Sequence, residues 1–339
     1  MRATYRPLVS SVLLLIGLLL ALPWATAAQP FLTRPQPGSL EALVQSVVRV
    51  ESRVPHNART ARSLGTSRSG SGVVIDNDGL VVTIGYLILQ AEQIRVIDHV
   101  GVQHPAAFVG YDGASGFGLL RILGNDKPPA ATLGRSVELA ERDPVLVLAH
   151  GAEPGHSALI TSLRTFAGYW EYLLEGAIFT TPPASDWSGA ALLNRKLEVV
   201  GIGSLAVRDA APNINLPGNM FVPIDALHPV LADLIATGGV RGPARPWLGL
   251  TLSEQYGRVI VLRATRGGPA AAVGIEEGDL VLEVAGVPVN GMEALYRNVW
   301  SLGAAGVEVP LRLVQKNRVT VVTVQSADRT FYYRASSMH

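Results

Sequence analysis

Residues 70–83 of the sequence are Gly-Ser-Gly-Val-Val-Ile-Asp-Asn-Asp-Gly-Leu-Val-Val-Thr. Two short apolar runs, 73–75 and 80–82, flank the polar segment Asp76-Asn77-Asp78-Gly79. β-Branched residues favour strands, whereas Asp, Asn and Gly favour tight turns. This stretch therefore predicts two strands joined by a turn.

Similar short apolar runs recur through the first two thirds of the chain. Further strands are expected at 94–97, 145–149 and 199–203. Many short strands separated by turn signals predict an all-β sandwich or barrel. Residues 223–236 instead have apolar residues near helical spacing and precede Gly238-Gly239, which predicts a closing helix.

The 339-residue length exceeds what one hydrophobic core usually serves, so two domains are expected. Residues 240–246 are rich in Pro, Gly and Arg and mark a linker between domains at 41–239 and 247–339. The second domain should contain strands near 247–252, 258–263, 279–284, 307–314 and 319–325, and helices at 269–273 and 292–302.

The first 27 residues have the pattern of an export signal. Arg2 and Arg6 precede an apolar run over 12–22, and Ala25-Thr26-Ala27 forms a small-x-small cleavage site. The alternative is an uncleaved inner-membrane anchor, although the run is short for a span of about 20 residues. Residues 28–40 are expected to be a linker, and the chain is expected to be periplasmic or otherwise exported.

Composition narrows the functional classes. Cleavage after Ala27 would remove two of the 28 basic residues and none of the 27 acidic ones, which leaves 26 basic against 27 acidic residues. This balance gives no support for nucleic-acid binding. The chain has no cysteine, which excludes disulfides and thiolate metal sites. We also expect no cofactor and no metal ion.

Five segments in order resemble the HtrA/Deg serine proteases. They are 70–76, 78–83, 109–112 with Leu119-Leu120, Trp187-Ser188-Gly189 with 192–194, and 200–203. The resemblance implies the double β-barrel fold of chymotrypsin-like proteases. It also places Tyr86, Gly116 and Ser188 at the positions of the catalytic histidine, aspartate and serine. The base and its orienting carboxylate are then missing, and the triad is vestigial.

The loop before Ser188 also departs from the family pattern. Asp186 and Trp187 stand where the family has Gly-Asn, and Asp186 is expected to restrict φ and to place a carboxylate near the oxyanion site. Ser188 is either a small residue in a tight turn or an active nucleophile. A substitute base could come from His150 or His156, although solvation of surface histidines is the simpler interpretation.

Four aromatic residues lie close together in the sequence, at Phe166, Tyr169, Trp170 and Tyr172. They are interpreted as packing residues, or alternatively as the lining of a specificity pocket or a partner surface.

The second domain resembles a PDZ domain. Trp247-Leu248-Gly249-Leu250 resembles its carboxylate-binding loop, and 267–280 resembles its Ser-Pro-Ala-x-x-Ala-Gly-Leu-x-x-Gly-Asp segment. The resemblance implies that a peptide C-terminus pairs with the strand after Gly249, with Leu295 and Val299 in the opposite wall. Alternatively, this face packs only against the chain's own protease domain.

Two functions from different classes follow. The first is a proteolytically inactive binding protein that holds unfolded proteins or C-terminal peptides, or regulates an active protease relative. The second is a serine endopeptidase that uses Ser188 with an unconventional base. By resemblance to the family, a homotrimer is expected in either case.

Overall fold

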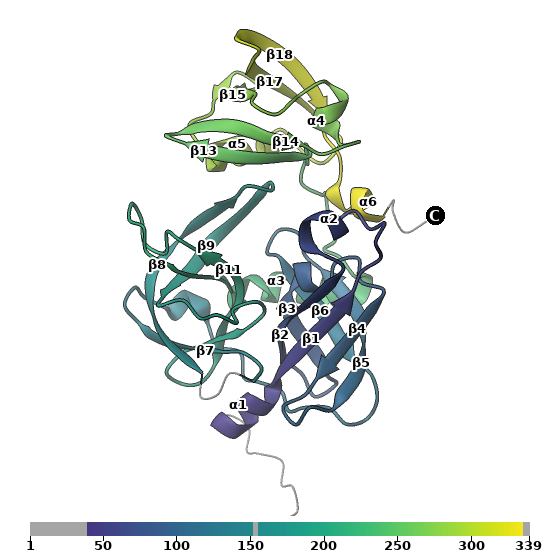
Figure 1. Ribbon diagram of the computed structural model, residues 1–339, viewed down its shortest axis with the longest axis vertical. Helices are drawn as coiled ribbons and strands as arrows, with labels where there is room; N and C mark the ends of the chain where they lie inside the picture. The colour runs from purple at the N-terminus through teal and green to yellow at the C-terminus, as the bar shows by residue number, and fades with distance from the viewer. Residues whose placement is uncertain (1–38, 152–154, 335–339) are drawn as a thin grey trace, which may run out of the picture. The chain divides into compact units, whose positions relative to one another are not determined.

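The computed structural model describes residues 39–151 and 155–334. The expected signal peptide, and all but the last residues of the linker after it, lie outside the described residues. The expected mainly β fold is confirmed, because the described part consists chiefly of strands arranged in two closed barrels and one further sheet (Figure 1).

The first barrel contains the two strands that residues 70–83 predict. They are β2 (Ser67–Val74) and β3 (Leu80–Ile84), paired with Val73 opposite Val82. The barrel closes in the order β1, β2, β3, β6, β5, β4. The remaining strands are β1 (Val47–Arg53), β4 (Gln93–Ile97), β5 (Gln103–Tyr111) and β6 (Phe117–Ile122).

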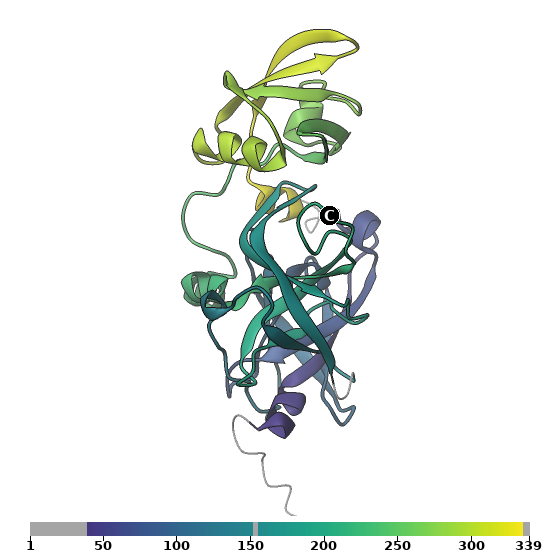
Figure 2. The same ribbon diagram turned by 90° about the vertical axis from the view of Figure 1, so that its left-hand side faces the viewer.

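The second barrel closes in the order β10, β11, β12, β9, β8, β7. Its strands are β7 (Pro144–Leu148), β8 (His156–Gly168), β9 (Tyr172–Thr181), β10 (Ala191–Leu193), β11 (Val199–Val207) and β12 (Gly218–Pro223). Strands β8 and β9 form a long hairpin whose last pair is Gly168 and Tyr172 (Figure 2). One apolar cluster includes buried residues of both barrels, among them Val82, Phe117, Leu148 and Ala191. The site described below lies where β3 and the loop before β10 meet.

Short helices close the ends of the barrels. They are α1 (Leu40–Ser46), α2 (Ala61–Leu64), α3 (His228–Thr237) and the 3-10 turns η1 (Gly85–Leu87), η2 (Ser136–Glu138) and η3 (Ile224–Ala226). The Ser39 side chain accepts from the Ala42 N–H at 3.1 Å and so caps α1. Helix α3 begins inside the predicted segment 223–236 and ends at Thr237, one residue beyond it, where Gly238 with φ +75° gives the left-handed C-terminal cap. No helix in the described part of the chain is long and apolar enough to cross a membrane.

The C-terminal unit has a sheet with the order β13, β14, β15, β17, β18, and β16 pairs with β15. Its elements are β13 (Leu250–Gln255), β14 (Arg258–Ala264), α4 (Pro269–Ala272), β15 (Leu280–Val284), β16 (Val287–Pro288), α5 (Met292–Ser301), β17 (Glu308–Gln315), β18 (Arg318–Gln325) and α6 (Arg329–Arg334). Strand β13 begins and ends three residues later than the expected 247–252, the short β16 and the final helix were not expected, and the other elements match the expected ranges to within one residue.

Candidate functional site

Tyr86 and Ser188 meet between the two barrels. Tyr86 lies in η1 directly after β3, and Ser188 lies in the loop between β9 and β10. The Tyr86 phenol oxygen is 2.9 Å from Ser188 Oγ and 2.9 Å from the main-chain oxygen of Ser204. The tyrosine thus bridges the serine loop and β11, and its ring packs partly buried against the shared apolar cluster.

This arrangement contains no proton acceptor suited to activating the serine. A phenol carries one hydrogen, and the Ser204 carbonyl can only accept it, so the Ser188 hydroxyl can at best donate to a neutral phenol oxygen. Burial raises the pKa of Tyr86 to about 12, with the hydrogen bond to Ser188 acting in the opposite direction. At neutral pH the phenol therefore stays protonated, whereas a general base needs a pKa near the working pH.

The position that the HtrA/Deg resemblance assigns to the catalytic aspartate is filled by backbone and by Tyr172. Gly116 has φ +86°, a conformation that residues with a Cβ rarely adopt, and it accepts the Gly85 N–H at 2.7 Å. A Cβ on Gly116 would lie 3.4 Å from the Tyr172 hydroxyl, which donates to the Ser115 carbonyl at 2.6 Å. No carboxylate from this position orients a group at residue 86.

Asp112 does not take over that role. Its carboxylate accepts the N–H groups of Ala114 at 3.0 Å and Ser115 at 2.9 Å, and so closes the turn that leads to Gly116. Both acceptor oxygens are thereby engaged within its own loop.

The serine loop itself is held in a tight turn. Gly189 has φ +72°, and a Cβ there would meet the Ser71 carbonyl oxygen at 1.9 Å. The Ser71 N–H donates to the Ser188 carbonyl at 2.7 Å, and the Thr83 hydroxyl donates to the Ser71 carbonyl at 2.6 Å. The Ser188-Gly189 pair therefore has a structural function in joining the loop to the first barrel.

The two residues before Ser188 differ in exposure. Asp186 is exposed, and its carboxylate accepts from the Ser185 hydroxyl at 2.8 Å. Its φ is not among the positive values, so the backbone adopts a conformation that a residue with a side chain tolerates. Trp187 is half-buried, and its carbonyl accepts the Ala190 N–H at 3.0 Å.

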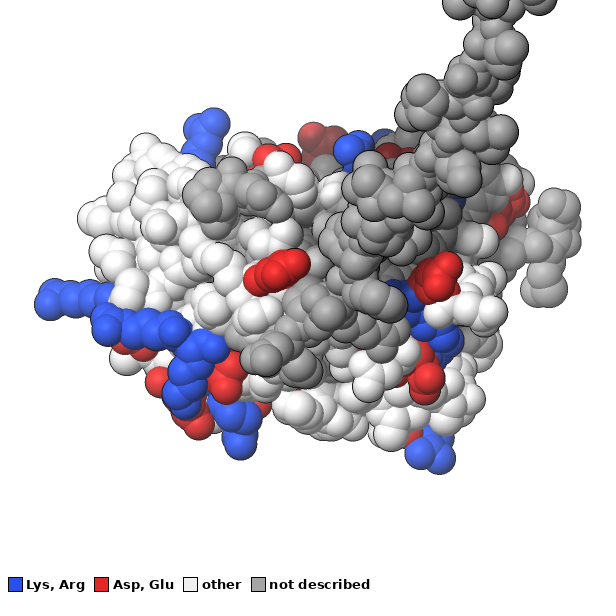
Figure 3. All heavy atoms as spheres, turned by 90° about the horizontal axis from the view of Figure 1, so that it is seen from below, with Lys and Arg blue, Asp and Glu red and all other residues white. Residues whose placement is uncertain are grey.

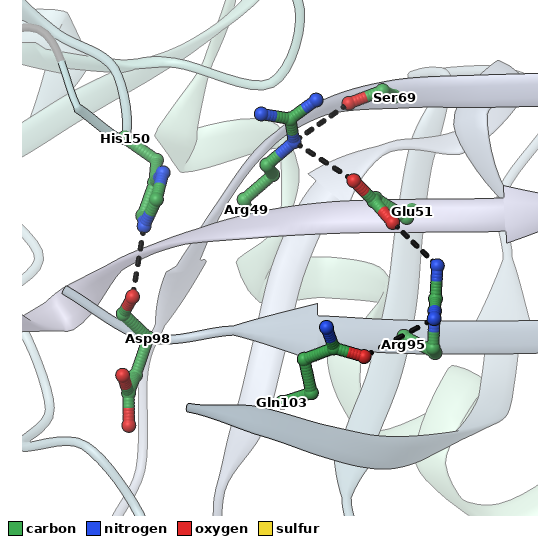
Figure 4. A network of polar contacts seen from close by, with 7 residues as sticks. All are labelled: Arg49, Glu51, Ser69, Arg95, Asp98, Gln103 and His150. Carbon is green, nitrogen blue, oxygen red and sulfur yellow. Dashed lines mark hydrogen bonds and ion pairs between the residues drawn. The ribbon is translucent and has the colours of Figure 1, made fainter. Parts of the chain in front are cut away.

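Neither candidate substitute base forms a described contact with Ser188. The His150 Nε2 lies 2.9 Å from the main-chain oxygen of Asp98 (Figure 4), and the His156 Nε2 lies 3.0 Å from that of Pro182. A third histidine, His104, pairs with the Asp98 carboxylate at 2.9 Å in a buried position. Each imidazole is thus engaged elsewhere.

Charged side chains on the outer face of the first barrel pair with one another. Glu51 on β1 lies 3.1 Å from Arg49 Nε and 2.8 Å from Arg95 Nη2, as Figure 4 shows. Exposed pairs of this kind add little stability. Basic and acidic groups also occur together on the face seen in Figure 3. No three His, Asp or Glu side chains within residues 39–151 and 155–334 are grouped to hold a metal ion.

The structure brings together most of the predicted peptide-binding residues. Leu248, Leu250, Leu295 and Val299 line one small cavity. Trp247 instead packs against Tyr332 of α6, with ring centroids 4.7 Å apart and the ring planes tilted by 46°. Gly249 has φ +82° in the turn of the loop. Tyr296 on α5 is a further lining residue.

A residue that the sequence analysis did not single out occupies this loop. Glu171, at the tip of the β8–β9 hairpin, accepts the Leu248 N–H at 2.8 Å and the Leu250 N–H at 2.6 Å. Burial raises the pKa of Glu171, and the nearby Arg329 guanidinium and the backbone N–H groups act in the opposite direction. The one feature of the sequence that could have pointed to Glu171 is its position within the aromatic run Tyr169-Trp170-Glu171-Tyr172.

The aromatic run consists mainly of packing residues. Trp170 stacks on Tyr172 with centroids 5.3 Å apart, and Phe166 contacts both rings as well as Phe179. Tyr169 remains 58% exposed but supplies a backbone contact to the C-terminal unit, because its carbonyl accepts the Leu252 N–H at 2.8 Å.

Comparison with known proteins agrees with the fold. Residues 70–202 match the trypsin-like peptidase domain, and residues 246–326 match the PDZ domain. The chain is 27% identical over 281 residues to a probable periplasmic serine endoprotease DegP-like of Chlamydia trachomatis, which covers 76% of this chain and 55% of that protein. It is 28% identical over 226 residues to the serine endoprotease DegS of Haemophilus influenzae, covering 65% of this chain and 66% of that one.

Solved structures show the same fold. The serine endoprotease from Yersinia pestis is 23% identical with a TM-score of 0.50, covering 86% of this chain and 99% of that chain. The HtrA-type protease AlgW with decapeptide is 20% identical with a TM-score of 0.52, covering 86% and 97%. The chain spans about half the length of the DegP-like relatives it matches.

The fold and the two matched domains define a trypsin-like peptidase domain followed by a PDZ domain. This domain order and the DegP-like and DegS relatives support the HtrA/Deg family for this chain.

Proposed function

We propose that this chain is a degenerate HtrA/Deg-type homologue that has no proteolytic activity and acts as an exported protein-binding or peptide-binding protein. The contact between Tyr86 and Ser188 is the observation that supports this most strongly. A protonated phenol lies 2.9 Å from the serine hydroxyl, where a working protease has an imidazole. Loss of a single triad member reduces the rate of a serine protease by up to about 10⁶-fold.

The PDZ domain and the remodelled barrel would supply the binding function. Leu248 to Leu250 form a loop of backbone N–H groups suited to a carboxylate, and the chain's relatives include a protease solved with a bound decapeptide. The partners proposed are unfolded proteins, C-terminal peptides or an active protease relative. Export to the periplasm is proposed because the DegP-like relatives are named periplasmic, and a homotrimer because the family resemblance implies one.

The test is fluorophosphonate labelling of the full chain, with the adduct located by mass spectrometry. Such probes react with serines that have an activated hydroxyl and a formed oxyanion site. We expect no adduct at Ser188 while an active relative labels fully. Ser188→Ala is the negative control, and Ser185→Ala tests labelling of a neighbouring exposed serine.

A stoichiometric adduct at Ser188 that disappears in Ser188→Ala would contradict the proposal. That result would favour an endopeptidase with an unconventional base, and the search for the base would start with His150 and His156.

A further inference from the structure

The tip of the β8–β9 hairpin occupies the carboxylate-binding loop of the PDZ domain with a side-chain carboxylate. Glu171 is buried, with 9% of its surface exposed, and receives the Leu248 and Leu250 N–H groups at 2.8 and 2.6 Å. A carboxylate that accepts successive backbone N–H groups is the interaction by which such a loop captures a peptide C-terminus.

The similarity to a bound peptide extends along the backbone. Tyr169, two residues before Glu171, accepts the Leu252 N–H at 2.8 Å through its carbonyl. Leu252 belongs to β13, the strand that directly follows the loop. The hairpin thus combines a carboxylate at the loop with strand pairing beyond it, as an added peptide strand does.

The apolar part of the groove is filled as well. Leu173 is 6% exposed and packs into the apolar cluster of the C-terminal unit with Leu248, Leu295 and Val299. A cavity of about 10 Å³ remains among these residues, which is roughly what a single water molecule needs. The groove therefore has no room for a second side chain while Leu173 is in place.

Two further groups fix the hairpin tip. The Tyr296 hydroxyl on α5 donates to the Gly168 carbonyl at 2.7 Å. Arg329 on α6 donates to the carbonyls of Trp170 and Glu171. These contacts hold Glu171 at φ +54°, a left-handed conformation that is unfavourable for a residue with a side chain. The strained residue is the same one that supplies the carboxylate.

We propose that the β8–β9 hairpin is an internal ligand that closes the PDZ groove, and that a peptide with a free C-terminal carboxylate and an apolar last side chain must displace Glu171 and Leu173 to bind. This regulation rests on the peptide-binding part of the proposed function. The Glu171 carboxylate and the C-terminal carboxylate of a peptide then compete for the same backbone N–H groups, because the loop cannot hold both at once.

The experiment uses the full chain and a fluorescein-labelled hexapeptide, Phe-Ala-Gly-Tyr-Trp-Leu. Its first five residues repeat residues 166–170, and its terminal carboxylate and leucine side chain replace those of Glu171 and Leu173. The amidated peptide is the ligand control. Glu171→Gln removes the internal carboxylate, and Glu171→Gln/Leu173→Ala also empties the apolar part of the groove.

Glu175→Gln is the matched protein control. Glu175 lies on the same hairpin and also bonds to α5, through Arg297, but its side chain is 62% exposed. Binding is measured by fluorescence polarisation, and hydrogen–deuterium exchange of residues 248–252 reports occupancy of the loop without any added peptide. Urea unfolding of each variant confirms that it is folded.

We expect Glu171→Gln to bind the free-acid peptide about tenfold to 100-fold more tightly than the wild type, because hydrogen bonds to a charged group are worth about 1.5–3 kcal/mol. Exchange at residues 248–252 should accelerate in parallel, and Glu175→Gln should match the wild type in both measurements. The double variant should bind at least as tightly as Glu171→Gln.

Equal peptide affinity and equal exchange in the wild type and both Glu171 variants would overturn the proposal. Faster exchange in Glu171→Gln without peptide binding by any variant would support the internal ligand, and would instead contradict the peptide-binding part of the proposed function. The two measurements therefore separate the failure of one proposal from the failure of the other.

Discussion

The Tyr172 hydroxyl donates a 2.6 Å hydrogen bond to the carbonyl of Ser115, the residue directly before Gly116. Gly116 itself has φ +86° and lies beside the Tyr172 ring. The backbone of Gly116 and the buried phenol of Tyr172 thus occupy the place from which an aspartate would orient a base at residue 86. Replacing one residue cannot rebuild the triad in this setting.

Tyr86→His should therefore not make the chain an effective protease. An imidazole at residue 86 would have no orienting carboxylate, and loss of that carboxylate alone costs a serine protease about 10⁴-fold. Hydrolysis of fluorescein-labelled casein should stay at least about 1,000-fold below that of an active relative. Gly116→Asp in addition should recover little, because it places a side chain at a positive φ. Casein hydrolysis by Tyr86→His within tenfold of the active relative would refute this prediction.

Tyr86→Phe should lower the free energy of unfolding by about 1–2 kcal/mol. It removes the hydrogen-bond partner of the Ser188 hydroxyl and the Ser204 carbonyl between the barrels. Urea unfolding at pH 7 measures the change. Tyr256→Phe is the control, because Tyr256 is fully exposed and should give no difference. Equal stability of the two variants would show that the contact contributes nothing.

Gly189→Ala should be far more destabilising than Gly267→Ala. Both glycines have nearly the same φ, +72° and +69°, but a Cβ at Gly189 would meet the Ser71 carbonyl at 1.9 Å while nothing lies within 4 Å at Gly267. The positive φ alone costs about 1–2 kcal/mol, and the collision at Gly189 should add about 1–3 kcal/mol. Thermal unfolding of the two variants gives the comparison, and equal losses would contradict the crowded turn.

Asp98 should make stability depend on pH in the acid range. Burial works to raise the pKa of the Asp98 carboxyl, but the hydrogen bonds from His104, Val102 and Val100 together outweigh it and hold the pKa below its usual range. A lowered pKa in the folded state means that the stabilisation is complete above the ordinary pKa of about 3.9 and is lost as the pH falls through the folded-state value.

The measurement is urea unfolding at pH 7 and again below pH 4, for the wild type and Asp98→Asn. The variant should be less stable at pH 7 by about 1–3 kcal/mol and should lose less stability on acidification than the wild type. Asp126→Asn removes an exposed carboxylate and serves as the control. An unchanged acid dependence in Asp98→Asn would rule out this carboxyl as its source.

The fold could be predicted from the sequence largely because its signals are local. The turn at Asp76-Asn77-Asp78-Gly79 and the β-branched runs beside it specify β2 and β3 without reference to distant residues. The same holds for the small-residue helix α4 and for α5. The β8–β9 hairpin was not expected as an element, because its tip is stabilised by contacts with residues about 80 and 130 positions away.

The candidate site could be predicted only in part. The register of Asp78-Gly79 and Val81-Val82 assigns Tyr86 to the position of the family's histidine. The second partner of the Tyr86 phenol is the main-chain carbonyl of Ser204, and a main-chain group cannot be identified from the residue type. Glu171 could not be assigned for a similar reason, since its role depends on backbone N–H groups of another domain. Helix α6 was also missed, because its contacts to Trp170 and Trp247 are long-range.

The Ser71 N–H bonds to the Ser188 carbonyl, and the Gly189 N–H bonds to the Gly203 carbonyl. These two contacts affect how a Ser-Gly pair in a sequence of this kind should be interpreted. Because this loop joins one barrel to the other, a serine followed by glycine has a packing function here that does not depend on catalysis. The presence of the Ser-Gly pair alone therefore does not distinguish a catalytic loop from a structural one. Residues 86 and 116 test catalysis more directly, because the family resemblance places the base and its orienting carboxylate at these two positions.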